Sequence, residues 1–153
     1  MSRIISPLKQ RITWIPVCRL AKRIMTESPQ KTILVAEDDS SMRRFIEITL
    51  KQAGYNVFAA EDGLEGMKIA LDNHIDAVVA DAIMPNLTGY DLCRMLRNHP
   101  EKRAVPLIIL SGLDPENPDK PAEHLADVFL TKGTDLKNDL LHGLNALLYP
   151  AEA

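Results

Sequence analysis

Short apolar runs alternate along this chain with longer stretches in which apolar residues recur every three or four positions. The short runs are typical of buried parallel strands, and the longer stretches have the period of helices that cover a sheet. Pro85 and the three prolines within residues 114–121 interrupt the pattern and predict loops. The pattern predicts strands at about Thr32–Glu37, Tyr55–Ala59, Ile75–Ala80, Pro106–Leu110 and Asp127–Thr131, and helices at about Ser40–Ala53, Gly63–Leu71, Gly89–Arg97, Pro121–Ala126 and Thr134–Leu148.

Strands that alternate with helices form parallel sheets, and their right-handed crossovers place helices on both faces. We therefore expect an α/β fold, a doubly wound five-stranded parallel sheet of order 2-1-3-4-5 with a flavodoxin-like arrangement. Asp39 or Ser40 is expected to cap the first helix. Helical spacing places several apolar side chains toward the sheet, among them Phe45, Leu64, Leu71 and Met95.

Four of the predicted strands end at side chains of different chemical kinds, namely Glu37-Asp38, Asp81, Ser111 and Lys132. Taken singly, each of these is more often a cap, a turn residue or a surface charge. The carboxyl ends of parallel strands, however, meet at one edge of the sheet, where ligands bind. Three carboxylates there repel one another unless a cation balances them, and oxygen ligands favour Mg²⁺ or Mn²⁺ over zinc. The set suits a divalent cation and a phosphoryl group, with Asp81 as a possible nucleophile.

These residues and their spacing resemble the receiver domain of two-component response regulators. The resemblance covers about Lys31–Leu148 and includes the segments Asp81-Ala-Ile-Met-Pro85 and Ser111-Gly112. From Asp38 to Asp81 there are 43 residues, then 30 to Ser111 and 21 to Lys132, and all three separations match the family.

The resemblance implies that Asp81 is the phosphoacceptor and takes its phosphoryl group from a histidine of a sensor kinase or a histidine phosphotransfer protein. Ser111 and Lys132 would contact the phosphoryl oxygens. Phe129 would be the aromatic side chain whose rotamer couples phosphorylation to repacking of the output face. The chain would be a switch that catalyses only its own phosphorylation and dephosphorylation, and not an enzyme.

The resemblance also implies a Mg²⁺ site. Asp38 and Asp81 would bind the ion directly, together with the main-chain carbonyl of Ile83, and Glu37 would hold a metal-bound water. Met42 and Arg43, at the start of the first helix, are candidates for contact with the kinase or phosphotransfer partner, and a place in the core is an equal alternative for Met42.

Some residues depart from the family pattern. Gly133 follows the lysine where proline is common, so a cis peptide is not expected there and the loop should be altered. Phe129 replaces a frequent tyrosine and lacks its hydroxyl. Ile83 and Leu113 occupy positions that tune dephosphorylation, and because both are apolar we predict a long-lived phospho-form. The loop at residues 114–121 lies on the usual output face, and it either reshapes partner choice or is a tolerated surface variation.

Charge is unevenly distributed along the 153 residues, whose formal net charge is −3. Residues 1–30 carry a net charge of +5 and the remainder −8. The negative body argues against direct binding of nucleic acid, so the downstream target should be a protein. Two cysteines without metal-ligand spacing, and the lack of an apolar stretch of membrane-spanning length, predict a cytoplasmic chain.

We divide the chain into a basic extension at residues 1–30 and a receiver domain at residues 31–150. The extension could bind a membrane surface, form a disordered tail, or precede a native start at Met25; we favour a dispensable or mis-started tail. Too few residues follow the last helix for an output module, so we expect a stand-alone receiver that acts on a partner or passes phosphate along a relay.

Two other functions remain open. A metal-dependent phosphohydrolase with Asp81 as nucleophile usually needs an acid two residues further on, where this chain has Ile83. A receiver-like binding module that never cycles is the second alternative, and the complete set of acids, Ser111 and Lys132 argues against it.

Overall fold

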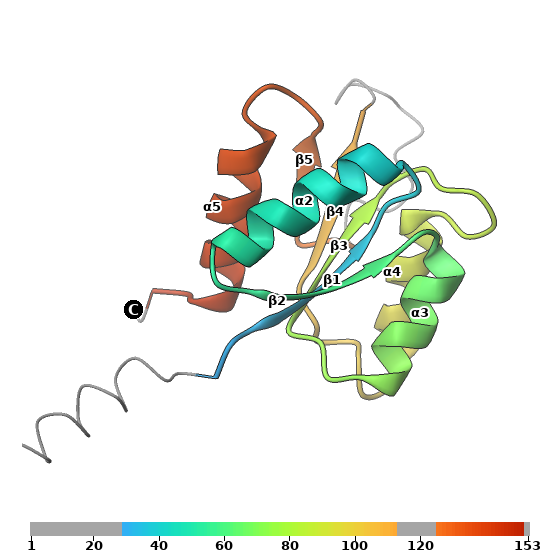
Figure 1. The fold of residues 1–153 in the computed structure, drawn as a ribbon. Helices are drawn as coiled ribbons and strands as arrows, with labels where there is room; N and C mark the ends of the chain where they lie inside the picture. Colours follow the sequence, from blue (N-terminus) through green and yellow to red (C-terminus); the bar gives the residue numbers. More distant parts are fainter. Residues whose placement is uncertain (1–28, 113–124, 152–153) are drawn as a thin grey trace, which may run out of the picture. The chain divides into compact units, whose positions relative to one another are not determined.

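The computed structural model describes residues 29–112 and 125–151 and forms one five-stranded parallel sheet of order β2-β1-β3-β4-β5 (Figure 1). The predicted α/β, doubly wound, flavodoxin-like fold is therefore confirmed. The strands are β1 (Thr32–Ala36), β2 (Asn56–Ala60), β3 (Ala77–Asp81), β4 (Leu107–Ser111) and β5 (Val128–Thr131). The helices are α2 (Ser40–Gln52), α3 (Gly63–Asp72), α4 (Gly89–Asn98) and α5 (Leu136–Leu148).

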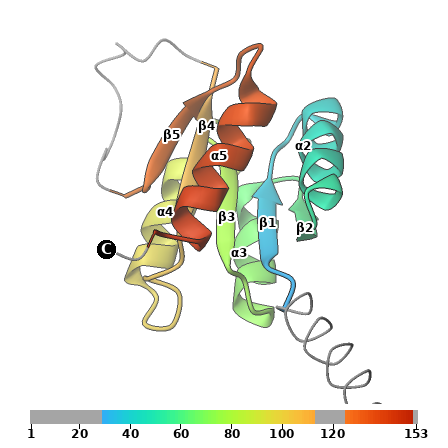
Figure 2. The ribbon, with the colours of Figure 1, turned by 90° about the vertical axis from the view of Figure 1, so that its left-hand side faces the viewer.

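Helices cover both faces of the sheet, α2 and α5 on one and α3 and α4 on the other (Figures 1 and 2). Successive strand residues point to opposite faces, so the central strands are apolar on both sides. In β1, for example, Ile33 and Val35 pack with the core under α2 and α5, whereas Leu34 and Ala36 pack with the core under α3 and α4. The central strands β1, β3 and β4 are thus buried on both faces, as their continuous apolar runs predicted, whereas the edge strands β2 and β5 are partly exposed.

Four predicted helix contacts were wrong, because Phe45, Leu64, Leu71 and Met95 are exposed. In α3 the buried stripe is Gly63, Gly66, Met67 and Ala70, which leaves Leu64 63% exposed. A Cβ added to Gly66 would lie 3.4 Å from the Leu92 side chain, so the missing side chain lets the helix approach its neighbours closely. A pattern of apolar side chains gives glycine no weight and therefore misplaces the inward face.

Polar side chains fix the starts of three helices, and at α3 the Asp62 carboxylate accepts a hydrogen bond from the Glu65 amide at 2.8 Å. Asp39, one of the two expected caps, accepts a hydrogen bond from the Met42 amide at 2.7 Å and caps α2. Thr88 and Asp91 form a reciprocal capping box at α4. These caps fix where each helix leaves the edge of the sheet that carries the acids.

Several predictions fall outside the described residues. They concern residues 1–28, Leu113, the loop at 114–121 and most of the helix predicted at Pro121–Ala126, of which Leu125 and Ala126 are described and are not helical. None of the helices in the described ranges combines the length and apolar character that crossing a membrane requires.

Candidate functional site

Three carboxylates meet at the carboxyl edge of the sheet. Strands β1 and β3 are neighbours, with Ala36 opposite Ala80. Glu37 and Asp81, which follow these two alanines, therefore lie side by side. Carboxylate oxygens of Glu37, Asp38 and Asp81 all lie within 4.8 Å of one another. The sequence placed Asp81 just after its strand; it is the last residue of β3. The convergence inferred from the strand order is present in the structure.

Lys132 reaches two of these carboxylates from the end of β5. Its Nζ lies 2.8 Å from Oε2 of Glu37 and 3.1 Å from Oδ2 of Asp81. Glu37 is 1% exposed and Asp81 is 7% exposed, whereas Asp38 is open to solvent. The lysine therefore offsets part of the negative charge of the two buried carboxylates, and the open side of the cluster is lined by Asp38.

Burial has a strong effect on the proton affinity of Glu37. Loss of hydration raises the pKa of Glu37 to about 7, and the negative charge of Asp81 adds to this, while the hydrogen bond from Lys132 opposes it. Burial alone would lower the pKa of Lys132, but its hydrogen bonds and ion pairs with Glu37 and Asp81 outweigh burial and raise it. Lys132 is therefore a permanent cation in this site at neutral pH.

The donor set fits a hard divalent cation. When all groups are ionised, three carboxylates and one ammonium leave two negative charges uncompensated. The cluster offers carboxylate oxygens and contains no histidine or cysteine, which suits Mg²⁺ or Mn²⁺ rather than zinc. The exposed Asp38 gives an ion a path from solvent to the cluster.

The remaining predicted site residues lie on the neighbouring strands and loops. Ser111, half-buried at the end of β4, faces Thr131 of β5, and its carbonyl accepts the Lys132 amide at 2.9 Å. Phe129 is half-buried and packs against the core under α3 and α4. The Ile83 side chain is exposed, and its amide makes a long contact of 3.4 Å with Oδ1 of Asp81. The described chain contains no cis peptide bond, so the expected trans bond before Gly133 is confirmed.

The loop from β3 to α4 packs tightly behind Asp81. A Cβ on Gly89 would overlap the carbonyl oxygen of Asp81, and one on Gly63 would overlap that of Leu87. Asn86 takes a positive φ of 68°, which an asparagine tolerates better than most residues. These contacts hold the main chain around Asp81 in one position.

Arg43 has a structural role that its sequence position did not reveal. We expected it as a candidate partner contact, but its guanidinium binds the main chain of the loop that carries Glu37 and Asp38. The signal that could have found it is helix geometry, because side chains in a first helical turn point back toward the helix start.

Comparison with known proteins agrees with this site. ArlR of Staphylococcus aureus, described as a response regulator, is 31% identical over 118 residues, which cover 76% of this chain and 52% of ArlR. The chain thus spans about half the length of the curated relatives it matches. The chemotaxis protein CheY4 of Vibrio cholerae is 26% identical with a TM-score of 0.71, over 78% of this chain and 99% of that one. The response regulator TrrA of Thermotoga maritima, solved with Mg²⁺ and BeF, is 26% identical with a TM-score of 0.70, over 78% of this chain and 100% of that one.

The family match covers most of the described body. Residues 33–144 match the response regulator receiver domain, a signalling family of two-component systems and not a classical enzyme family. This range contains all the site residues discussed above. With this match, the strand order and the acidic cluster, the chain belongs to the response regulator receiver domain family.

Proposed function

We propose that this chain accepts a phosphoryl group on Asp81 from a phosphohistidine of a sensor kinase or phosphotransfer protein. The observation that carries the proposal is the meeting of Glu37, Asp38 and Asp81 within 4.8 Å beside the Lys132 ammonium. The phosphorylated chain then binds a downstream protein or passes the group along a relay.

The chain's own residues support each part of this transfer. An Oδ atom of Asp81 forms the new O–P bond as the P–N bond of the donor breaks, and the imidazole nitrogen keeps the electron pair. Lys132 already contacts Asp81 and can move its ion pair to a phosphoryl oxygen. Ser111, at the end of the adjacent strand β4, donates its hydroxyl to another. Tight packing at Gly89 keeps the Asp81 main chain fixed while the side chain reacts.

Mg²⁺ is the proposed cofactor. Asp38, Asp81 and the Ile83 carbonyl would hold it directly, and Glu37 through a water. The bound ion supplies positive charge that offsets the phosphoryl oxygens during transfer. The related TrrA was solved with Mg²⁺ and BeF, which supports the assignment.

Phe129 is the proposed switch residue. It lies on β5, three positions before Lys132, so a change in the lysine's partner at the site can alter the packing of this strand. The kinase or phosphotransfer partner and the downstream protein are likewise part of the proposal.

The experiment is phosphorylation by acetyl phosphate, followed by intact mass. We expect a single adduct of one phosphoryl group that requires Mg²⁺ and disappears in Asp81→Asn. The control is Asp72→Asn, which removes an exposed acid at the far end of α3 and should leave the adduct unchanged. An adduct that persists in Asp81→Asn would refute the assignment of the phosphoacceptor.

Two further outcomes separate the alternatives. Continuous release of phosphate without an accumulating adduct would favour the phosphohydrolase. A folded chain that takes no phosphate, from acetyl phosphate or from a phosphorylated histidine phosphotransfer domain, would favour the binding module that does not cycle.

A further inference from the structure

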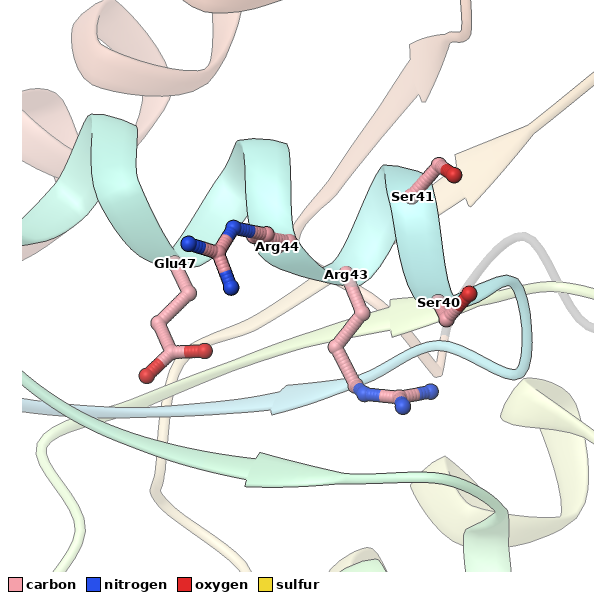
Figure 3. A pocket seen from close by; sticks show the side chains of 5 residues that line it. All are labelled: Ser40, Ser41, Arg43, Arg44 and Glu47. Atoms are coloured by element: carbon pink, nitrogen blue, oxygen red, sulfur yellow. The ribbon is translucent and has the colours of Figure 1, made fainter.

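Arg43 reaches back from α2 to the loop that carries the acid pair. It is the fourth residue of the helix, and helical side chains tilt toward the helix start. Its Nη1 donates to the carbonyl oxygen of Glu37 at 2.8 Å and makes a longer contact of 3.4 Å with that of Asp38. Figure 3 shows the side chain extending away from the helix toward the strands. The guanidinium therefore holds the main chain of two proposed metal-site residues.

The same guanidinium joins a second loop. Its Nη2 lies 3.3 Å from Oε1 of Glu61, which follows β2, and the Glu37 amide donates to Ala60 at 3.1 Å. The Glu61 side chain is 76% exposed, so this ion pair contributes little. The two main-chain carbonyls, which receive charge-assisted bonds from a largely buried group, carry the interaction.

Besides Arg43, the loop is held by the bond from the Glu37 amide to Ala60, by the ion pair of Lys132 with the Glu37 carboxylate, and by polar groups of its own. The Asp39 amide donates to Oε1 of Glu37 at 3.2 Å, and the Asp39 side chain caps α2. These bonds set the direction of the Glu37 carboxylate, while Arg43 fixes the peptide groups behind it. Without the guanidinium, the carbonyl of Glu37 loses its 2.8 Å partner and the acid pair gains freedom.

We propose that Arg43 is a positioning residue, which holds Glu37 and Asp38 in the arrangement that binds the cation; this rests on the proposed function. Arginine suits the role because its planar group presents several N–H donors in fixed directions, whereas a lysine ammonium is a single point. Outer-shell groups of this kind change metal affinity by roughly 10- to 100-fold when removed.

The chain offers a matched control in the next residue. Arg44 carries the same charge on the same helix and lines the same open pocket of about 420 Å³ with Ser40, Ser41, Arg43 and Glu47. Figure 3 shows its side chain running along the helix near Glu47, away from the loop. Removing Arg44 therefore tests the effect of net charge without disturbing the carbonyl contacts.

The test measures cation binding directly, using Mn²⁺ titrations followed by electron paramagnetic resonance. We expect Arg43→Ala to raise the dissociation constant about tenfold or more, Arg43→Lys to raise it by less, and Arg44→Ala to stay within twofold. Glu61→Gln should also stay within about twofold. The rate of adduct formation from acetyl phosphate should fall in Arg43→Ala at low Mg²⁺ and return to within threefold of the parent at saturating Mg²⁺.

Each outcome decides the proposal. An Arg43→Ala chain that binds Mn²⁺ within twofold of the parent, or an equal loss in Arg44→Ala, overturns it. If Arg43→Ala does not fold in the absence of metal, Arg43→Lys carries the test, and an unchanged constant there overturns it. If the parent chain binds Mn²⁺ but forms no adduct, phosphoryl transfer is refuted. The Mn²⁺ dissociation constants of the parent and the Arg43 variants then still decide whether Arg43 positions the site. If the parent chain binds no Mn²⁺, both the proposed metal site and the role of Arg43 are overturned.

Discussion

Glu37 and Lys132 show how single residues set the electrostatics of this site. A carboxylate that is 1% exposed is stable only beside a cation, and the Lys132 Nζ lies 2.8 Å away. The same ammonium also contacts Asp81, so one lysine serves two carboxylates. A phosphoryl group on Asp81 would compete for this ammonium. Negative charge added at Asp81 would thereby weaken the ion pair between Lys132 and Glu37.

The raised pKa of Glu37 predicts how stability depends on pH. In the unfolded chain this carboxyl titrates near 4.5, and in the metal-free fold its pKa is about 7. The protonated form therefore contributes stability that is complete below pH 4.5 and is lost as pH rises through about 7. Between pH 5 and 8.5 we expect this group to lower the free energy of unfolding by on the order of 1–3 kcal/mol.

Urea unfolding in EDTA at several pH values measures this loss. Glu37→Gln should remove the contribution of Glu37 to the pH dependence of the free energy of unfolding, whereas Glu47→Gln on α2 should keep this contribution. The raised pKa of Lys132 acts only at pH values near or above 10.5 and does not disturb this window. A parent and a Glu37→Gln chain with identical slopes would contradict the prediction.

At the scale of elements, the start of α4 is fitted against the end of β3. A Cβ on Gly89 would overlap the carbonyl oxygen of Asp81, and main chain cannot move away as a flexible side chain can. We expect Gly89→Ala to reduce the free energy of unfolding by about 2 kcal/mol or more. The control is Gly133→Ala, because a Cβ there meets nothing within 4 Å. Equal urea midpoints for the two variants would show that the fit of α4 is loose.

Arg97 joins three segments near the amino ends of strands β4 and β5, away from the edge that carries the acids. From α4 it donates to the carbonyls of Arg103 at 2.7 Å, Val105 at 2.8 Å and Leu125 at 3.0 Å, and it pairs with Asp127 at 2.9 Å. Removing it leaves two partly buried carbonyls, those of Val105 and Leu125, without this donor, so Arg97→Ala should cost about 2–4 kcal/mol.

The control for Arg97→Ala is Arg94→Ala on the same helix. Arg94 pairs with Asp91 at 3.1 Å, but both side chains are exposed, so its removal should cost less than about 0.5 kcal/mol. Chemical unfolding of the two variants measures the difference. Similar losses would show that the Arg97 bonds are no stronger than a surface ion pair.

For the whole molecule, the uncompensated negative charge at the sheet edge predicts stabilisation by Mg²⁺. A ligand that binds only the folded chain adds about 2.7 kcal/mol at 100 times its dissociation constant. We therefore expect the thermal midpoint to rise by several degrees in Mg²⁺ and to fall back in EDTA. KCl at matched ionic strength should not reproduce the rise, and neither Asp38→Asn nor Asp81→Asn should show it in full. A midpoint equal in Mg²⁺ and EDTA would argue against the metal site.

The sequence alone determined the strand order and the position of the acid cluster. Apolar runs that each stop at a polar residue are a local property, and the doubly wound pattern of alternating strands and helices, with order 2-1-3-4-5, converts their sequence into neighbours in space. Asp81 and Lys132 therefore could be assigned to one sheet edge before any coordinates. The cap of α2 was equally local, because Asp39 bonds an amide three residues away.

Only the tertiary structure decided which helix faces are buried and how the charges are shared. Gly66 lets α3 approach Leu92, and a side-chain pattern cannot register an absent side chain, so Leu64 was assigned inward although it is exposed. The pKa of Glu37 depends on how much water the surrounding fold excludes, and Arg97 bonds the carbonyls of Val105 and Leu125, which lie in separate segments of the chain. Periodicity and strand order are encoded along the chain, whereas dehydration and contacts with main-chain atoms arise only when the elements pack together.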